Sequence, residues 1–196
     1  MKNQKNNTPQ EEIIINQTID TLKSGGVILY PTDTIWGIGC DATNPEAIQK
    51  VFDIKKRASD KALITLVSNY KMLYNIFSNI PENAYTIWEL SDKPTTLILD
   101  NPRNVSEQII SSDKALGVRI VKEGFCYKLI EKFKKPIVST SANISGMPSP
   151  TCFDDITTEI RSKVDYIVEL NTKTIMNKPS TIIKLTLDNR VTIIRK

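Results

Sequence analysis

The sequence predicts a layered α/β (α+β) domain, built on a mixed sheet of about seven strands with flanking helices. Short apolar runs alternate with segments whose apolar residues recur at helical spacing. The last two predicted strands are separated only by Asp188, Asn189 and Arg190, a turn signal that favours an antiparallel hairpin. Because no repeat or linker interrupts this pattern, we expect a flexible polar tail over residues 1–12 and one domain over residues 13–196.

The first half of the chain alternates between helical and extended patterns. Residues 16–24 predict a helix that Gly25 and Gly26 can end, and residues 27–30 predict a strand. Asn44 and Pro45 predict the start of a second helix, which continues to about residue 57. A strand over residues 62–67 and helices over residues 70–77 and 81–90 follow.

The second half repeats the alternation. Residues 95–99 and 116–121 are short, mainly apolar runs and predict strands. Residues 124–133 predict an amphipathic helix, and residues 153–164 predict another. The remaining predicted strands are residues 136–139, 166–170, 181–187 and 191–195. The segment 31–42, from Pro31 onward, is expected to be a loop of hydroxyls, one aromatic residue and two glycines, either a structural turn or a site for a small anion.

Composition narrows the chemistry. The 196-residue chain contains no histidine, which excludes Ser-His-Asp and Cys-His catalysis and His-ligated metals. Three scattered cysteines argue against both a disulfide framework and a zinc site. The net charge of +4 suits an anionic substrate and is compatible with weak binding of tRNA or other RNA. No apolar run is long enough to span a membrane and no signal peptide is visible, so we expect a cytoplasmic protein.

Three groups of side chains are candidates for ligand binding. Lys55, Arg57 and Lys61 follow one another closely near a helix end, where they form either an anion cradle or a solvated surface. Arg119 lies inside an apolar strand and needs a partner, which is either a protein carboxylate or a ligand carboxylate. Ser139, Ser141 and Asn143 alternate at a strand end, where they either grip a ligand or cap a turn.

The ordered set of motifs resembles the YrdC-like family of threonylcarbamoyl-AMP synthases, in its short single-domain form. The resemblance covers residues 25–195, and each piece alone is weak. The motifs are Pro31-Thr32-Asp33-Thr34, Trp36-Gly37-Ile38-Gly39, Lys55-x-Arg57, Ser141-Ala142-Asn143-x-Ser145-Gly146, Pro179-Ser180-Thr181 and the terminal Ile194-Arg195. The family fold implies a twisted mixed sheet with a concave, positive cavity.

The resemblance also implies a reaction and its site. L-Threonine, bicarbonate or CO2, and ATP would yield L-threonylcarbamoyladenylate and pyrophosphate. A downstream threonylcarbamoyl transferase complex would then modify adenosine 37 of tRNAs that read ANN codons. Mg²⁺ is expected to arrive with the ATP phosphates, with no metal held by the protein. The implied catalytic residues are Lys55 and Arg57; the implied threonine-binding residues are Thr32, Trp36, Arg119, Ser139 and Ser180; the implied ATP-binding residues are Lys55, Arg57, Lys61, Ala115, Ser141, Asn143, Ser149 and Arg195.

Some positions depart from the family pattern. Residues 91–96 replace the usual Pro-Gly-Pro segment, Ala62 stands where proline is frequent, and Leu66 stands where many members have histidine. The alternative hypothesis is a non-catalytic RNA-binding factor in tRNA or ribosome maturation. The chain lacks aromatic residues interleaved along a basic strand, which favours the enzyme.

Overall fold

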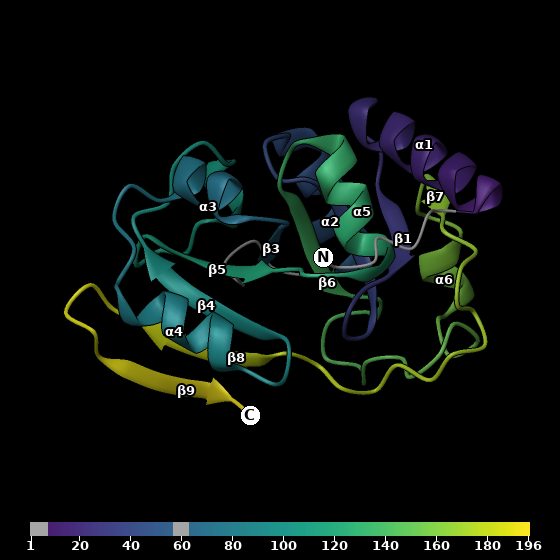
Figure 1. Ribbon diagram of the computed structural model, residues 1–196. Coiled ribbons are helices and arrows are strands. Elements are labelled where there is room, and N and C mark those ends of the chain that lie inside the picture. The colour runs from purple at the N-terminus through teal and green to yellow at the C-terminus, as the bar shows by residue number, and fades with distance from the viewer. Residues whose placement is uncertain (1–7, 57–62) are drawn as a thin grey trace.

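Residues 8–56 and 63–196 are described by the computed structural model, in which one twisted sheet runs through the molecule (Figure 1). Nine strands within these residues form the sheet, in the order β7-β1-β2-β6-β3-β5-β4-β8-β9. Both parallel and antiparallel neighbours occur, so the expected mixed sheet is confirmed, with nine strands in place of about seven. The strands are β1 (Ile28–Pro31), β2 (Trp36–Asp41), β3 (Ile64–Val67), β4 (Thr95–Asp100), β5 (Ala115–Ile120), β6 (Ile137–Ser141), β7 (Tyr166–Ile167), β8 (Thr181–Leu185) and β9 (Val191–Arg195).

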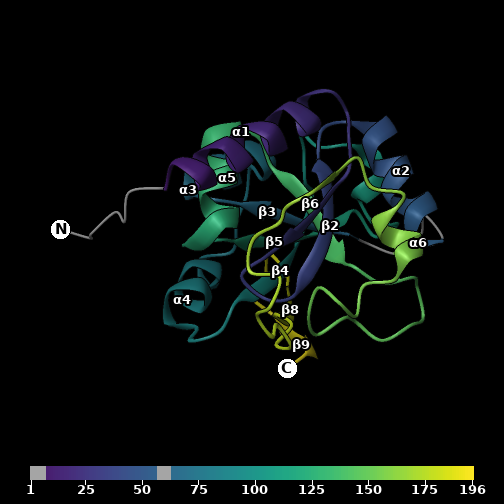
Figure 2. The same ribbon diagram turned by 90° about the vertical axis from the view of Figure 1, so that its right-hand side faces the viewer.

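Helices lie on both sides of the sheet (Figure 2). On one side, α1 and α5 pack on the sheet through a cluster that includes Ile15, Leu22, Phe125 and Leu129. On the other side, α2 contributes Ile48, Val51 and Phe52 to a second cluster. The helices are α1 (Pro9–Lys23), α2 (Pro45–Lys55), α3 (Tyr70–Ile76), α4 (Asn83–Leu90), α5 (Gly124–Phe133), α6 (Thr158–Arg161) and the 3-10 turn η1 (Glu107–Ile109). No helix among the described residues is long and apolar enough to cross a membrane.

The largest correction concerns β2, which the sequence analysis assigned to a loop. Residues 36–41 instead pair antiparallel with both β1 and β6. Large and small side chains alternate along β2, and a Cβ on Gly39 would lie 2.6 Å from the Val138 carbonyl oxygen and 2.8 Å from Tyr30 Cε1. The two glycines therefore allow close packing on one face of the strand, and the period-two alternation with Trp36, Ile38 and Cys40 was the overlooked strand signal.

Two helix predictions need new boundaries. The first helix begins at Pro9, so the expected tail over residues 1–12 is wrong for residues 9–12. Thr8 is the N-cap, since its hydroxyl accepts from Glu11 N at 3.2 Å, and Pro9 opens the first turn. The predicted helix over residues 153–164 is wrong except for α6. The Asp155 carboxylate accepts from Thr151 N at 2.9 Å and Cys152 N at 3.2 Å, and this turn competes with the helix.

The second helix was predicted closely. Asn44 Oδ1 accepts from Ala47 N at 3.1 Å, as expected of an N-cap, an interaction that contributes about 1 kcal/mol. The helix ends at Lys55, two residues earlier than expected, because Lys56 adopts a left-handed conformation with φ 49°. Its end meets the end of β6, since Ser145 N donates to the Lys55 carbonyl oxygen at 2.9 Å. This hydrogen bond joins the motif that begins at Lys55 to the motif over residues 141–146.

Candidate functional site

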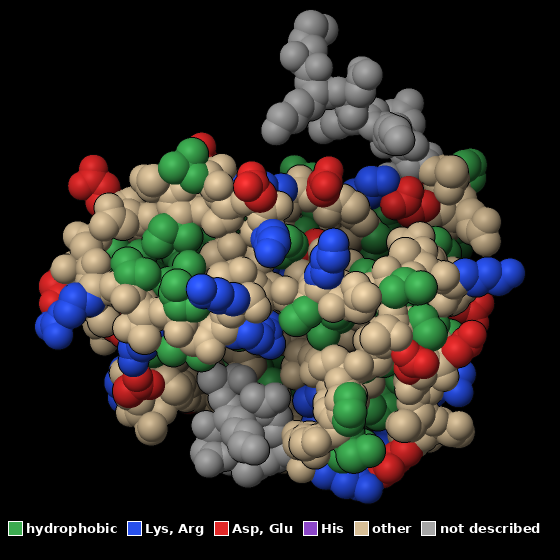
Figure 3. Space-filling view, turned by 90° about the horizontal axis from the view of Figure 1, so that it is seen from below, with side chains coloured by type: hydrophobic (Ala, Val, Ile, Leu, Met, Phe, Trp, Pro, Cys, Tyr) green, Lys and Arg blue, Asp and Glu red, His purple; other side chains and the backbone are tan. Residues whose placement is uncertain are grey.

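A cavity of about 210 Å³ lies where the β1–β2 turn, the ends of β5 and β6, and the C-terminal strands meet. Its bordering elements β8 and β9 lie at the bottom of Figure 1, and Figure 3 looks at that side of the molecule. Lys and Arg side chains spread over the centre of this face, and Asp and Glu side chains lie mainly nearer its margin (Figure 3). The lining residues are Thr32, Thr34, Ile35, Gly37, Leu63, Ile64, Arg119, Ser139, Thr140, Ser141, Ser149, Pro179, Ser180, Ile182 and Arg195.

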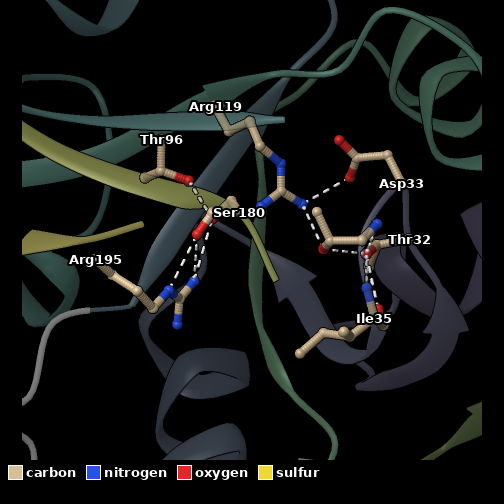
Figure 4. A network of polar contacts seen from close by, with 8 residues as sticks. Thr32, Asp33, Ile35, Thr96, Arg119, Ser180 and Arg195 are labelled. Atoms are coloured by element: carbon tan, nitrogen blue, oxygen red, sulfur yellow. Dashed lines mark hydrogen bonds and ion pairs between the residues drawn. The ribbon is translucent and has the colours of Figure 1, made fainter. Parts of the chain in front are cut away.

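Arg119 is the buried cation of this cavity. Its side chain, on β5, is only 4% exposed, and its Nη2 donates to Asp33 Oδ1 at 2.7 Å (Figure 4). The same nitrogen lies 3.4 Å from Thr34 Oγ1. Arg119 Nε is buried, and no described residue accepts a hydrogen bond from it. The sequence left open whether Arg119 pairs with a protein or a ligand carboxylate, and the structure shows that the protein partner is Asp33. Because Arg119 also lines the cavity, its guanidinium group can contact a ligand there.

Thr32 organises the turn between β1 and β2. Its Oγ1 accepts from Thr34 N at 3.0 Å and from Ile35 N at 3.2 Å, and it donates to the Ile35 carbonyl oxygen at 2.7 Å (Figure 4). These contacts are those of a hydroxyl that closes a turn on its own backbone. Thr32 thus lines the cavity as predicted, but its hydroxyl already serves the turn.

A second cation enters from the C-terminal strand. Arg195 Nε and Nη2 donate to the Ser180 carbonyl oxygen at 3.0 and 2.9 Å, and Ser180 Oγ lies 3.0 Å from Thr96 Oγ1 (Figure 4). Burial, with a smaller contribution from the positive charge of Arg119, lowers the pKa of Arg195 below its usual value. The positive charges of Arg119 and Arg195 repel each other at one cavity, and a bound anion would reduce this repulsion. The site is therefore suited to an anion.

Three further predicted residues line the same cavity. Ser139 and Ser141 lie on β6, where Ser139 is paired with Gly39 on one side and Ile64 on the other. Ser149 lies in the segment after β6 and is exposed. Thr32, Arg119, Ser139, Ser141, Ser149, Ser180 and Arg195 are therefore brought together from the predicted set.

Lys55 is placed differently from the prediction. Its side chain is buried, and its Nζ donates to the carbonyl oxygens of Ser141 and Asn143 at 2.5 and 2.6 Å. Its position in the last turn of α2 directs the ammonium group at the loop after β6 rather than into the lining of the cavity. In this structure Lys55 anchors the loop through charge-assisted hydrogen bonds.

Trp36 does not wall the cavity. It is fully buried in the core beneath α2, and its ring centroid lies 5.1 Å from that of Phe153. Successive side chains of a strand point to opposite faces, and the neighbours Ile35 and Gly37 occupy the cavity side. The cavity's apolar wall comes instead from Ile35, Leu63, Ile64 and Ile182.

Two other predicted contacts are satisfied within the protein. Ser111 binds the backbone of Ala115: Ser111 Oγ accepts from Ala115 N at 3.1 Å and donates to its carbonyl oxygen at 2.9 Å. The amide of Asn143 turns into its own loop, where Nδ2 donates to the Met147 carbonyl oxygen at 2.6 Å. Neither residue lines the cavity. Within the described residues, the Asn143 Oδ1 atom is buried without a hydrogen-bond partner. Arg57 and Lys61 lie outside the described residues.

Three polar residues at the site had weak or no signals in the sequence. Asp33 was named only as part of the Pro31–Thr34 motif, and it proves to be the partner of Arg119. Thr34 and Thr96 were not singled out; each bonds a predicted residue. In the part of the chain that the structure describes, no cluster of three or more His, Cys, Asp or Glu side chains could hold a metal ion.

A family profile matches residues 20–196, nearly the whole chain; it is that of the Sua5/YciO/YrdC domain, described as "Telomere recombination". The chain belongs to this family. A Sua5/YciO/YrdC relative from Vibrio parahaemolyticus, named threonylcarbamoyl-AMP synthase, is 32% identical over 169 residues, which cover 85% of this chain and 91% of that protein. A Pyrococcus abyssi protein of the same name is 30% identical over 90% of this chain, which spans about half of it, 52%.

Solved structures of the family show the same architecture. The Sua5 structure from P. abyssi complexed with L-threonine is 28% identical, with a TM-score of 0.76 over 89% of this chain and 51% of that one. E. coli YciO matches with a TM-score of 0.81 over 97% of this chain and 91% of that one, at 24% identity, and establishes the fold alone. Both agree with the mixed sheet and flanking helices of the present chain.

Proposed function

We propose that this chain is an L-threonylcarbamoyladenylate synthase, which forms threonylcarbamoyl-AMP and pyrophosphate from L-threonine, CO2 or bicarbonate, and ATP. The observation that carries the proposal is the cavity in which Arg119, Arg195 and several hydroxyls converge, in a chain whose relatives are named threonylcarbamoyl-AMP synthases. The catalytic function is favoured over a non-catalytic RNA-binding factor, because relatives that match most of the chain are named for the synthase and these groups line one cavity.

We assign the residues that line the cavity to two substrates. Arg119, with Thr32, Ser139 and Ser180 around it, is suited to hold the carboxylate and hydroxyl of threonine. Ser141, Ser149 and Arg195 lie along the same cavity and are suited to the phosphates and ribose of ATP. Arg57 and Lys61 are also proposed to bind the ATP phosphates. Mg²⁺ is treated as part of the nucleotide substrate.

The chemistry asks mainly for orientation and charge neutralisation. The amine of threonine attacks CO2 to give a carbamate, and a carbamate oxygen then attacks the α-phosphorus of ATP. The bond from that phosphorus to the bridging oxygen breaks, and pyrophosphate leaves. Arg119 and Arg195 neutralise the negative charges that meet in the cavity, and the fixed hydroxyls orient the carbamate, so no histidine is needed.

The decisive experiment is mass spectrometry of the products formed by purified protein with ATP, threonine and bicarbonate. We expect threonylcarbamoyl-AMP and an equal amount of pyrophosphate. Arg119→Met should abolish the product, since it removes the carboxylate partner. Binding of RNA without any adenylate would instead support the non-catalytic alternative.

The product is proposed to feed the modification of adenosine 37 in tRNAs that read ANN codons, through a separate threonylcarbamoyl transferase complex. We propose a cytoplasmic location for this step. Incubation of the purified protein with unmodified tRNA and all three substrates should give the adenylate and no modified adenosine. Modified tRNA in the absence of any partner would contradict this division of labour.

A further inference from the structure

A second cavity, of about 330 Å³, has Asp33 as part of its wall. Asp33 also bonds Arg119, which lines the first cavity (Figure 4). The Asp33 side chain is 17% exposed, in contrast to 4% for Arg119. Asp33 therefore stands between the two cavities, with one oxygen on the buried cation and access to solvent.

The hydrogen bonds of Arg119 define where a ligand carboxylate can bind. Nη2 donates to Asp33 Oδ1, whereas the buried Nε has no hydrogen-bond partner in the part of the chain that the structure describes. Arg119 lines the first cavity, so a ligand carboxylate bound there can accept hydrogen bonds from its guanidinium group. It then lies beside Asp33, on the same guanidinium group. In an α-amino acid the ammonium group is one carbon away from the carboxylate, which brings it within reach of Asp33.

We propose, on the basis of the proposed function, that Asp33 binds the α-ammonium group of threonine while Arg119 binds its carboxylate, and that Asp33 accepts the ammonium proton before the amine attacks CO2. Asp33 is then a catalytic residue, and it is also the residue that selects ligands with an amino group. Its exposed side passes the proton to water in the second cavity.

The proton balance of this step is complete. The ammonium group gives one proton to the Asp33 carboxylate and becomes a neutral amine. The nitrogen lone pair forms the bond to the carbon of CO2, and one C=O electron pair moves onto oxygen. Asp33 releases its first proton to solvent and accepts the second N–H proton. The sum converts R–NH3⁺ and CO2 into R–NH–COO⁻ and two protons.

Among the described residues, Asp33 supplies the carboxylate that contacts Arg119. Burial raises the pKa of the Tyr30 hydroxyl and of the Cys126 thiol, so both stay neutral. Lys122 Nζ donates to the Trp88 carbonyl oxygen at 2.7 Å. The ionisable groups that face Asp33 or share its cavity are Arg119 on β5, Tyr30 on β1, Cys126 on α5, Asp92 and Lys93 before β4, and Lys122 and Glu123 after β5.

Calorimetry tests the recognition step without reference to turnover. Wild-type protein should bind threonine at least tenfold more tightly than 3-hydroxybutyrate, which lacks the amino group. Asp33→Asn keeps an oxygen for Arg119 but loses the charge, and should bind the two ligands about equally. Asp92→Asn and Glu123→Gln, which change acids in the same second cavity, should keep the wild-type preference. An unchanged preference in Asp33→Asn overturns the proposal.

Kinetics test the proton transfer. General bases contribute about 10²–10⁴-fold, so Asp33→Asn should lose at least about a hundredfold in kcat at pH 7. The deficit relative to wild type should shrink toward pH 9, because the free-amine fraction rises about tenfold per pH unit. Asp33→Glu should restore part of the rate, and melting temperatures should show that each variant folds. A deficit independent of pH, or a larger loss in Glu123→Gln, overturns Asp33 as the base. If wild-type protein forms no adenylate but keeps the threonine preference, the proposed function fails while recognition by Asp33 stands.

Discussion

Replacement of Lys55 by methionine separates an anchoring role from direct binding of ATP. The ammonium group is buried, with the residue 1% exposed, and it donates to two carbonyl oxygens at 2.5 and 2.6 Å. Hydrogen bonds to charged groups contribute about 1.5–3 kcal/mol each, so losing both should cost roughly 3–6 kcal/mol. For a chain of this size about 2–4 °C is lost per kcal/mol, which gives a fall in Tm of roughly 6–24 °C.

The neighbouring lysine provides the matched control. The Lys56 side chain is 58% exposed and forms its ion pair, with Glu159, at 2.7 Å. Exposed pairs contribute about 0–1 kcal/mol, so Lys56→Met should shift the Tm by no more than a few degrees. Thermal melting by circular dichroism measures both shifts, and hydrogen exchange at Ser145 reports whether the loop after β6 has loosened. A normal Tm for Lys55→Met, together with lost ATP binding, would refute the anchoring role.

Three further predictions follow from the same cavity and sheet. Arg57→Ala should reduce pyrophosphate release by roughly a hundredfold or more with an unchanged Tm, because two charge-assisted hydrogen bonds to ATP contribute about 1.5–3 kcal/mol each. Near-normal turnover would show that this segment is a solvated surface. Threonine should be used in preference to serine and valine, since the hydroxyls beside Arg119 reject valine and a lost methyl contact costs serine about 1–3 kcal/mol; competition assays with equal turnover of all three would contradict this pocket. Gly39→Ala should lower the free energy of unfolding by about 1–3 kcal/mol, because the added Cβ lies 2.6 Å from a carbonyl oxygen. Gly117→Ala is the control and should be tolerated, since its nearest contact is at 3.5 Å. Denaturant titration compares the two variants, and equal unfolding midpoints would count against the close packing of β2.

The elements that the sequence predicted well are those whose signals are local. The Asn44 cap bonds a backbone amide three residues away, and the last two strands are joined by a short turn. Residues 124–133 form α5 within the predicted bounds, because their apolar residues alone define the buried face. Such features depend on neighbours in the chain, so a single sequence carries them.

Family motifs also indicated which residues gather at the cavity. Seven of the predicted residues line it, from the β1–β2 turn to β9. The motifs could not state what each side chain bonds, because those partners come from distant segments. Arg119 and Asp33 are 86 positions apart, as are Lys55 and Ser141.

Tertiary structure decided the direction of each side chain and the use of each donor. Trp36 faces the core because β2 is a strand, in which successive side chains alternate between faces, and a loop would have imposed no such alternation. Lys55 anchors backbone because the end of α2 meets the loop after β6. Arg119 Nη2 bonds Asp33 because β5 and the β1–β2 turn pack together, and burial makes this neighbouring carboxylate effective. The same burial makes it costly that Arg119 Nε has no partner among the described residues.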